Sequence, residues 1–322
     1  MPKVFDKIMF YDVLQLSSYS GGWYKIPNIH KAEEFCKNMA TSHYENFPVG
    51  SILIPKKNRQ DIYNIYSFAR TADDIADTLL EFNTNERLSI LENYLNNLRI
   101  YVRDFDKPKH NKPLFNPTLL ASARTIRELN LPISLNERLI HAFAMDANFK
   151  SPDTFEDLLN YCSFSANPIG EIILRIFDLY NESTIKYSND ICTALQLANF
   201  WQDFSVDLPN GRCYIPAEIL EKYDLNVNNK IDWHKHPNFI LVLQELYNYT
   251  DNLFNSGINL LKYLKPYRLK LEIETTVRGG KLILEKSKEL KEDILIRRPI
   301  INKINFIPLL IKSLLFIKMK PI

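Results

Sequence analysis

Acidic side chains interrupt two apolar, helix-forming stretches of this 322-residue chain, and they constrain its folding more than any other feature. The second stretch, residues 197–207, reads Leu-Ala-Asn-Phe-Trp-Gln-Asp-Phe-Ser-Val-Asp, and the pattern predicts a helix that continues to Pro209. Asn199, Asp203 and Asp207 are spaced at i, i+4 and i+8, so they share one helical face. Such a face is either solvated or holds a hard cation, because carboxylate and amide oxygens are the ligands that Mg²⁺ prefers.

The first acidic stretch lies in a helix that we predict over residues 59–80. Tyr66, Arg70, Asp73 and Asp77 fall on one face of it. Aromatic neighbours indicate that this face looks inward or into a cleft, where an unpaired carboxylate costs several kcal/mol. Either Arg70 forms a structural salt bridge with Asp73, or the carboxylates converge on a metal ion. A solvated face is the third reading.

Composition favours an all-α fold. The chain has only eight glycines and no Gly-rich phosphate loop, which argues against dinucleotide-binding and P-loop folds. No β-alternation persists long enough to propose a sheet. The formal net charge of +2 gives no sign of nucleic-acid binding. The four cysteines are widely spread without a C-x-x-C pair, so we expect free thiols in a reducing cytoplasm.

The chain divides into three parts. Residues 1–27 are expected to be a flexible lead-in, residues 28–300 the body of the protein, and residues 301–322 an apolar and basic C-terminal helix. No signal peptide is expected at the N-terminus. The C-terminal segment is too short and too charged to span a bilayer, which needs about 20 apolar residues. It either packs on the body or lies at a membrane surface with its lysines reaching outward.

Further helices are expected within the body. Their predicted ranges are 28–47, 86–103, 117–129, 135–148, 239–264 and 272–296, with residues 224–238 as a polar loop. Pro168 should kink or break a helix and expose Asn167 to a ligand, or it simply marks a helix boundary. His43 and Asn46, at a helix end, either cap that helix or donate hydrogen bonds to an anion. Arg212 follows a turn and either binds phosphate or neutralises Asp207.

If the two acidic faces meet across a helical bundle, four carboxylates and an amide could hold several Mg²⁺ ions. Magnesium bridging a diphosphate stabilises the charge that develops on this leaving group. Departure of the diphosphate leaves a carbocation, which an apolar and aromatic cavity would protect from water. The sequence therefore predicts a magnesium–diphosphate site above a central apolar cavity.

Several strings resemble the squalene/phytoene synthase family from about His30 to Pro299. The Asp73-x-x-x-Asp77 pair and the Asn199, Asp203 and Asp207 series match its two aspartate-rich helices. Three strings resemble the subgroup that forms hydroxysqualene in bacterial hopanoid biosynthesis: His-Tyr-Glu-Asn-Phe-Pro at 43–48, Ser-Ala-Asn-Pro-Ile-Gly at 165–170 and Asn-Phe-Trp-Gln-Asp at 199–203. Condensing relatives tend to carry arginine where Gln202 stands. Glu171 departs from the basic residue expected there.

The resemblance implies an all-α isoprenoid-synthase fold and a reaction. Presqualene diphosphate would ionise, rearrange and capture water to give hydroxysqualene, with two or three Mg²⁺ ions and no nicotinamide. The implied metal ligands are Asp73, Asp77, Asn199, Asp203 and Asp207. The implied catalytic residues are the four aspartates with Asn167 and Tyr214, and the implied substrate-binding residues are His43, Asn46, Phe47, Tyr66, Arg70, Tyr161, Asn199, Gln202 and Arg212. We expect a cytoplasmic protein, peripheral to the inner face of the membrane and coupled to a presqualene diphosphate synthase.

Two other functions stay open. One is the head-to-head condensation of two farnesyl diphosphates to squalene, dehydrosqualene or presqualene diphosphate. The other is a non-catalytic helical scaffold that binds diphosphate lipids, or whose acidic faces are merely salt-bridged. Incubation with farnesyl diphosphate alone separates the first from the favoured reading, and a turnover assay separates the second.

Overall fold

A computed structural model describes residues 28–42, 53–77, 79, 82–106, 116–226, 230–301 and 303–319. The described residues form helices and contain no strand, as the sequence predicts. The helices are α2 (Ile29–Ser42), α3 (Lys56–Asp77), α4 (Thr84–Arg103), α5 (Pro117–Glu128), α6 (Ser134–Ala147), α7 (Phe155–Ser165), α8 (Asn167–Ile176), α9 (Glu182–Gln202), α10 (Phe204–Asp207), α11 (Ala217–Lys222), α12 (Phe239–Gly257), α13 (Tyr267–Leu290) and α14 (Lys303–Met319). Short 3₁₀ helices are η2 (Lys230–Lys235), η3 (Ile258–Lys262) and η4 (Lys291–Leu295).

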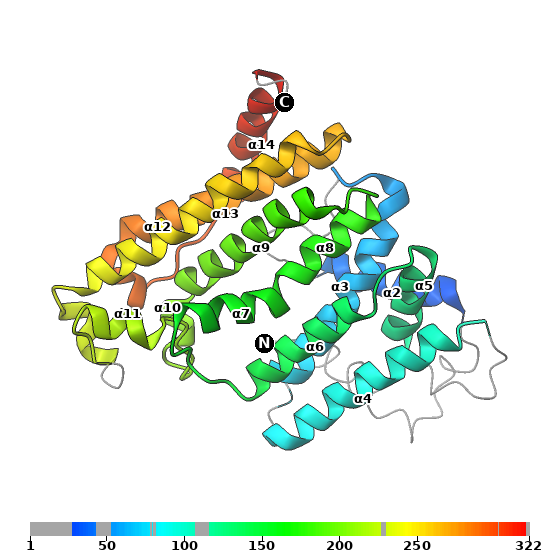
Figure 1. The fold of residues 1–322 in the computed structure, drawn as a ribbon, viewed down its shortest axis with the longest axis horizontal. Helices are drawn as coiled ribbons and strands as arrows, with labels where there is room; N and C mark the ends of the chain where they lie inside the picture. Colours follow the sequence, from blue (N-terminus) through cyan, green and yellow to red (C-terminus); the bar gives the residue numbers. More distant parts are fainter. Residues whose placement is uncertain are drawn as a thin grey trace.

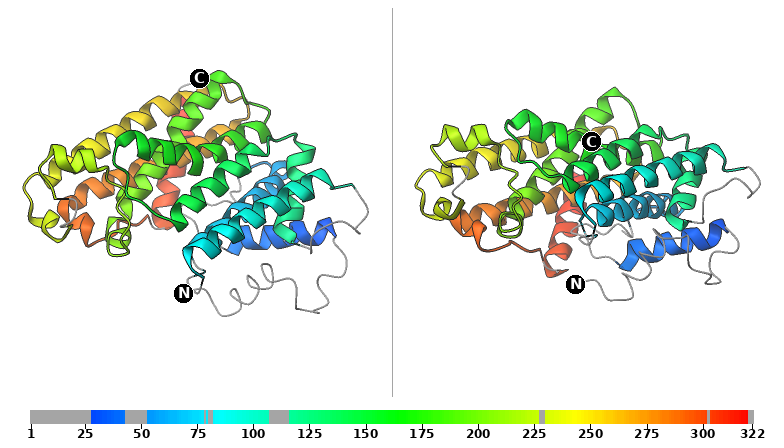
Figure 2. Two further views of the ribbon diagram at one scale, coloured as in Figure 1. Left: turned by 60° about the horizontal axis from the view of Figure 1, so that its bottom comes forward. Right: turned by 90° about the horizontal axis from the view of Figure 1, so that it is seen from below.

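Helix α9 lies at the centre of the packing. It contacts α7, α8, α12 and α13, while α2 to α6 pack among themselves and meet the rest through α7 and α8 (Figures 1 and 2). One core cluster joins α2 to α6 and part of α8, and each of the two others includes residues of α9. Trp201 on α9 is fully buried, and its indole N–H donates to the Thr250 hydroxyl of α12 at 2.9 Å. The C-terminal end of α9 is therefore held rigidly.

Local sequence sets several helix ends. Asn83 and Thr154 form capping boxes with Glu86 and Asp157, which satisfy backbone N–H groups at the starts of α4 and α7. Pro168 stands in the first turn of α8, where its missing N–H costs nothing. Helix α7 ends at Ser165 and α8 begins at Asn167, so Pro168 marks a helix boundary, which is the second of the two predicted alternatives.

Some predicted ranges were wrong. The helix expected over 239–264 ends as α-helix at Gly257 and continues as the 3₁₀ helix η3. The loop expected over 224–238 contains the 3₁₀ helix η2. The helix expected over 272–296 begins earlier, at Tyr267, and gives way to η4 after Leu290. No disulfide joins the four cysteines. The lead-in predicted for residues 1–27 lies outside the described residues.

Candidate active site

The second acidic stretch is not one continuous helix. Helix α9 ends at Gln202, Asp203 is its C-terminal cap, and the single turn of α10 ends at Asp207. The backbone N–H groups of Asp203 and Asp207 still bond to carbonyls four residues earlier, at 3.0 and 2.8 Å. The break therefore preserves the i, i+4 spacing of Asn199, Asp203 and Asp207, although the prediction of unbroken helix to Pro209 was wrong.

Arg212 links the two acidic stretches. Its backbone N–H donates to the carbonyl oxygen of Asp207 at 2.9 Å, and its Nη2 donates to Asp77 Oδ1 at 2.6 Å. A side chain from the turn after α10 thus reaches the last residue of α3, 135 positions earlier in the chain. The hydrogen bond that Arg212 donates to Asp77 is the main cause that raises the pKa of Arg212, so this guanidinium stays charged.

Negative charge accumulates where the stretches meet. Burial, followed by the nearby Asp203, raises the pKa of Asp207 to about 6, and Asp77 adds to the shift across the gap between the helices. Asp77 and Asp207 are therefore close enough for their charges to interact. A bound cation would relieve this repulsion.

Arginines balance the carboxylates. Arg70 Nη2 lies 2.7 Å from Asp74, and its Nη1 lies 3.5 Å from Asp73. Arg298 pairs with Asp203. The Arg70–Asp73 salt bridge weighed from the sequence is therefore present, and Asp74 is the closer partner. Sequence reasoning missed the role of Arg298, since the Arg-Arg-Pro sequence at 297–299 indicates only a helix end.

The donor set fits magnesium in chemistry. Among the described residues, no three His, Cys, Asp or Glu side chains are already gathered as a metal centre. Asp73, Asp77 and Asp203 instead form ion pairs with arginines. Asp73, Asp77, Asp203 and Asp207, with the half-buried Asn199, offer the oxygen ligands that Mg²⁺ prefers, and they are the residues that would hold it.

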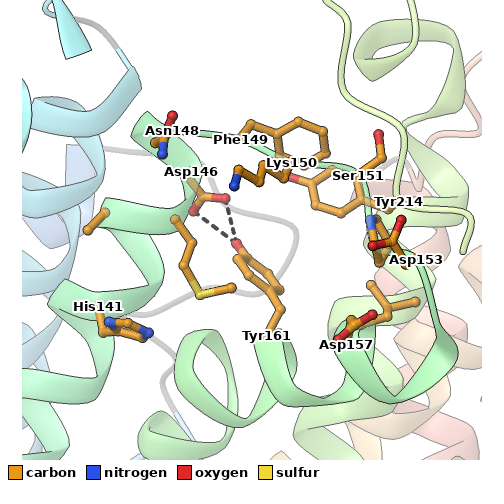
Figure 3. A pocket seen from close by; sticks show the side chains of 14 residues that line it. His141, Asp146, Asn148, Phe149, Lys150, Ser151, Asp153, Asp157, Tyr161 and Tyr214 are labelled. Atoms are coloured by element: carbon orange, nitrogen blue, oxygen red, sulfur yellow. Dashed lines mark hydrogen bonds between the residues drawn. The ribbon is translucent and has the colours of Figure 1, made fainter. Parts of the chain in front are cut away.

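A cavity of about 470 Å³ is lined by residues of α6, of α7 and of the loop between them, and by Tyr214 (Figure 3). It lies near the acidic stretches, since the charge of Asp77 contributes to the raised pKa of both Asp146 and Tyr214 on its wall. Tyr161, Tyr214 and Phe149 line it, and Phe200 stacks on Tyr214 with ring centroids 3.7 Å apart. Asp146 also lines it, so its lining is mixed and not purely apolar as the sequence led us to expect. The aromatic rings still provide a wall that could face a carbocation.

Asp146 is a site residue that sequence reasoning missed. The Tyr161 hydroxyl donates to both carboxylate oxygens of Asp146 at 2.9 Å, as Figure 3 shows. Burial raises the pKa of Asp146 to about 7, and the charges of Asp77 and Asp73 add to the shift. Asp146 therefore belongs to the same electrostatic site. It lies on α6, where no repeated acidic pattern marks it in the sequence.

This pKa predicts a pH-dependent stability that Asp146→Asn should remove. The folded state favours the protonated carboxyl, so its stabilising effect is full below pH 3.8 and disappears as pH rises to about 7. Relative to Asp146→Asn in metal-free buffer, the wild type should lose up to ~4 kcal/mol of unfolding free energy between pH 4 and 8. Urea unfolding at several pH values measures this. A difference in unfolding free energy between the two proteins that does not change with pH would show that the pKa of Asp146 is not raised.

The remaining predicted residues are placed as follows. Asn167 is buried at the start of α8, and its Oδ1 accepts a hydrogen bond from the Thr193 hydroxyl at 3.1 Å. Tyr66 is half-buried beside Arg70. Gln202 is fully buried and donates to the carbonyl oxygen of Pro299 at 2.7 Å. His43, Asn46 and Phe47 lie outside the described residues.

The unexpected Glu171 is balanced by cations. Its carboxylate lies 2.7 Å from Arg175 on the same helix and 3.7 Å from Arg138 on α6. An acidic residue at this position is therefore accommodated as part of a structural ion pair.

The chain is similar to known proteins over most of its length. The family model described as squalene/phytoene synthase matches residues 40–304. A hydroxysqualene synthase of Rhodopseudomonas palustris is 31% identical over 238 residues, which are 72% of this chain and 76% of that protein. A hydroxysqualene synthase of Sinorhizobium fredii is 26% identical over 82% of this chain and 84% of that protein.

A solved structure shows the same fold. The crystal structure of squalene synthase HpnC from Alicyclobacillus acidocaldarius is 30% identical, with a TM-score of 0.73 over 82% of this chain and 95% of that one. The squalene/phytoene synthase family acts on isoprenoid diphosphates and uses a divalent metal to ionise them. With its matching family model and its helical fold, this chain belongs to the squalene/phytoene synthase family.

Proposed function

We propose that this protein is a hydroxysqualene synthase that converts presqualene diphosphate into hydroxysqualene. The observation that carries the proposal is the Arg212 bridge. Its guanidinium bonds the Asp77 carboxylate of α3, its backbone N–H bonds the Asp207 carbonyl of α10, and Tyr214, two residues on, lines an aromatic-walled cavity. The names of the relatives support the choice of reaction within the family.

The residues divide the work between the two ends of the substrate. Arg212, Arg298 and Arg70 supply planar guanidinium groups that can grip the diphosphate oxygens, each by two parallel hydrogen bonds. Two or three Mg²⁺ ions on Asp73, Asp77, Asn199, Asp203 and Asp207 would neutralise the charge of the leaving group. No nicotinamide is expected, because water capture requires no reductant.

The reaction balances without a further reactant. The carbon–oxygen bond to diphosphate breaks, and both electrons leave with the diphosphate. The cyclopropylcarbinyl cation rearranges against the rings of Tyr161, Tyr214 and Phe149, whose π faces stabilise positive charge. Water then adds to the cation and releases a proton, which gives the alcohol.

Asn167 is proposed to position the capturing water. The Thr193 hydroxyl fixes its amide oxygen, so the amide orientation is set before substrate arrives. In Asn167→Ala, the ratio of other products to hydroxysqualene should rise at least ~10-fold, the size of effect expected for one lost hydrogen bond. Mass spectrometry of the products measures this. Hydroxysqualene as the sole product at the wild-type rate would remove Asn167 from the mechanism, and Asn181→Ala, at the cap of α9, is the control.

The function itself is tested by product analysis. Purified protein with Mg²⁺ and presqualene diphosphate should give hydroxysqualene, whereas farnesyl diphosphate alone should remain unreacted. Formation of squalene, dehydrosqualene or presqualene diphosphate from farnesyl diphosphate would establish the condensing alternative. No turnover of either substrate, together with no Mg²⁺-dependent rise in Tm, would favour the scaffold.

The C-terminal helix supports a peripheral place at the membrane. No helix in the described part of the chain is long and apolar enough to cross a bilayer. Ile307, Ile311 and Leu315 nonetheless form an exposed apolar row on α14, whose opposite face packs on α13 (Figure 1). After Asp293 the sequence has no acidic residue and six basic ones, which complement an anionic leaflet.

This location predicts lipid-dependent binding. Vesicles rich in phosphatidylglycerol should co-sediment with the wild type and retain at least ~10-fold less of an Ile311→Glu, Leu315→Glu variant, because charges on that face cannot enter the interface. Equal retention of both proteins would refute this location. The control places glutamate at the exposed Leu241 of α12. On such a surface the protein would receive its greasy substrate from a presqualene diphosphate synthase, to which we expect it to be functionally coupled.

A further inference from the structure

The segment 296–301 crosses the end of α9 and carries Arg298 to the acidic site. None of its residues belongs to a helix, and it joins η4 to α14. Its beginning is held by Asp293, whose carbonyl oxygen accepts from the backbone N–H groups of Ile296 and Arg297 at 3.0 and 2.8 Å. Arg298 and Ile300 are exposed, whereas Pro299 between them is buried. The segment is therefore fixed at Pro299.

Gln202 holds this fixed point. It is fully buried at the last position of α9, and its Nε2 donates to the Pro299 carbonyl oxygen at 2.7 Å. A buried amide that loses its partner is costly, which makes the position of Pro299 depend on this bond. Gln202 is adjacent in sequence to Asp203, and Pro299 is adjacent to Arg298. The bond between Gln202 and Pro299 therefore places Arg298 next to Asp203.

The Arg298–Asp203 ion pair cannot fix the segment by itself. The side chain of Arg298 is 40% exposed and that of Asp203 is 28% exposed. Ion pairs as open as this one contribute little to stability, since solvent screens them and two side chains must be ordered. The place of the guanidinium must then come from the backbone that carries it.

We propose that Gln202 is a positioning residue that delivers Arg298 to the diphosphate site through its hydrogen bond to Pro299. In the absence of substrate, Arg298 is paired with Asp203. When a diphosphate binds, Arg298 can form bidentate hydrogen bonds with it instead. This assigns Gln202 a role behind the site instead of in direct contact with substrate. The assignment rests on the proposed function only in taking diphosphate as the ligand.

Gln202→Met tests the tether, because methionine has nearly the same volume but no donor. Hydrogen exchange of the amides in 296–301 should become at least ~10-fold faster, the change expected for one lost hydrogen bond. Gln202→Leu, which also lacks the donor, is the second variant should the first fail to fold. Thr250→Val is the matched control, since it removes the buried hydrogen bond of the adjacent Trp201 and leaves Pro299 untouched.

Binding of inorganic pyrophosphate with Mg²⁺, measured by calorimetry, tests the coupling to Arg298. Gln202→Met and Arg298→Ala should each weaken binding, and the double variant should bind no more weakly than Arg298→Ala alone. Additive losses, unchanged exchange in 296–301 or no pyrophosphate binding by the wild type would each overturn the proposal. Failure to convert presqualene diphosphate, with these binding results intact, would instead overturn only the proposed reaction.

Discussion

Asp203→Asn is expected to lower kcat on presqualene diphosphate by at least ~100-fold, because it removes a charge from the metal ligands that stabilise the leaving group. Asp73→Asn, on the opposite helix, should have an effect of the same size. The two substitutions keep the shape of the side chain, so their effects report charge. Steady-state turnover at saturating Mg²⁺ measures them, with hydroxysqualene quantified by mass spectrometry.

The control for this prediction is Asp190→Asn on α9, the helix that Asp203 caps. The Asp190 carboxylate accepts a hydrogen bond from Ser256 at 2.6 Å and lies outside the proposed site. It should leave turnover within ~2-fold of wild type, as expected for a substitution away from the reacting groups. Chelation of divalent ions should abolish wild-type activity. Undiminished turnover in EDTA, or equal losses in Asp190→Asn and Asp203→Asn, would contradict a metal role for the aspartates.

Arg212→Met is expected to reduce kcat/KM by about 100-fold while changing stability little. The loss reflects one charged donor removed from the leaving group, for which 10²–10³-fold effects are typical. The side chains of Arg212 and Asp77 are 27% and 36% exposed, so the pair should contribute no more than ~1 kcal/mol to folding. Arg212→Lys keeps the charge but loses the planar, bidentate guanidinium. Its kcat/KM should therefore lie between those of the wild type and Arg212→Met.

A second measurement separates the two roles of Arg212. Without the competing guanidinium, Asp77 and Asp207 should attract a cation more strongly, so Mg²⁺ should raise the Tm of Arg212→Met more than that of the wild type. Arg99→Met is the control, since Arg99 pairs with Glu137 at 2.7 Å on the surface. If Mg²⁺ shifts the Tm of Arg212→Met less than that of the wild type, Asp77 and Asp207 do not share a cation site.

Much of the site could be predicted from the chain because helical spacing alone brings some residues together. Asp73 and Asp77 share a face of α3, and the i, i+4 spacing of Asn199, Asp203 and Asp207 survives the helix break at Asp203. The positions of Pro168 and the capping residues likewise mark helix ends through local backbone chemistry. These features depend on neighbours within one or two turns.

Other site features depend on how the helices cross. Asp146 is one acidic residue on α6 until α7 places the Tyr161 hydroxyl against it. Arg298 lies 95 positions from Asp203 in the chain, and Gln202 is taken for a substrate contact until its bond to Pro299 is known. The predicted helix to Pro209 was also wrong, since α9 ends at Gln202 and α10 begins at Phe204 after the cap residue Asp203.

The sequence by itself determined the helical class, the two acidic faces and the chemistry that their oxygens favour, because helix periodicity and ligand preference are local properties. Only the tertiary structure decided which arginine pairs with which carboxylate, that Tyr161 bonds Asp146 and that Gln202 bonds the Pro299 carbonyl. Charge interactions and burial act through space between residues far apart in the chain, and their strength depends on distances and desolvation that only packing sets.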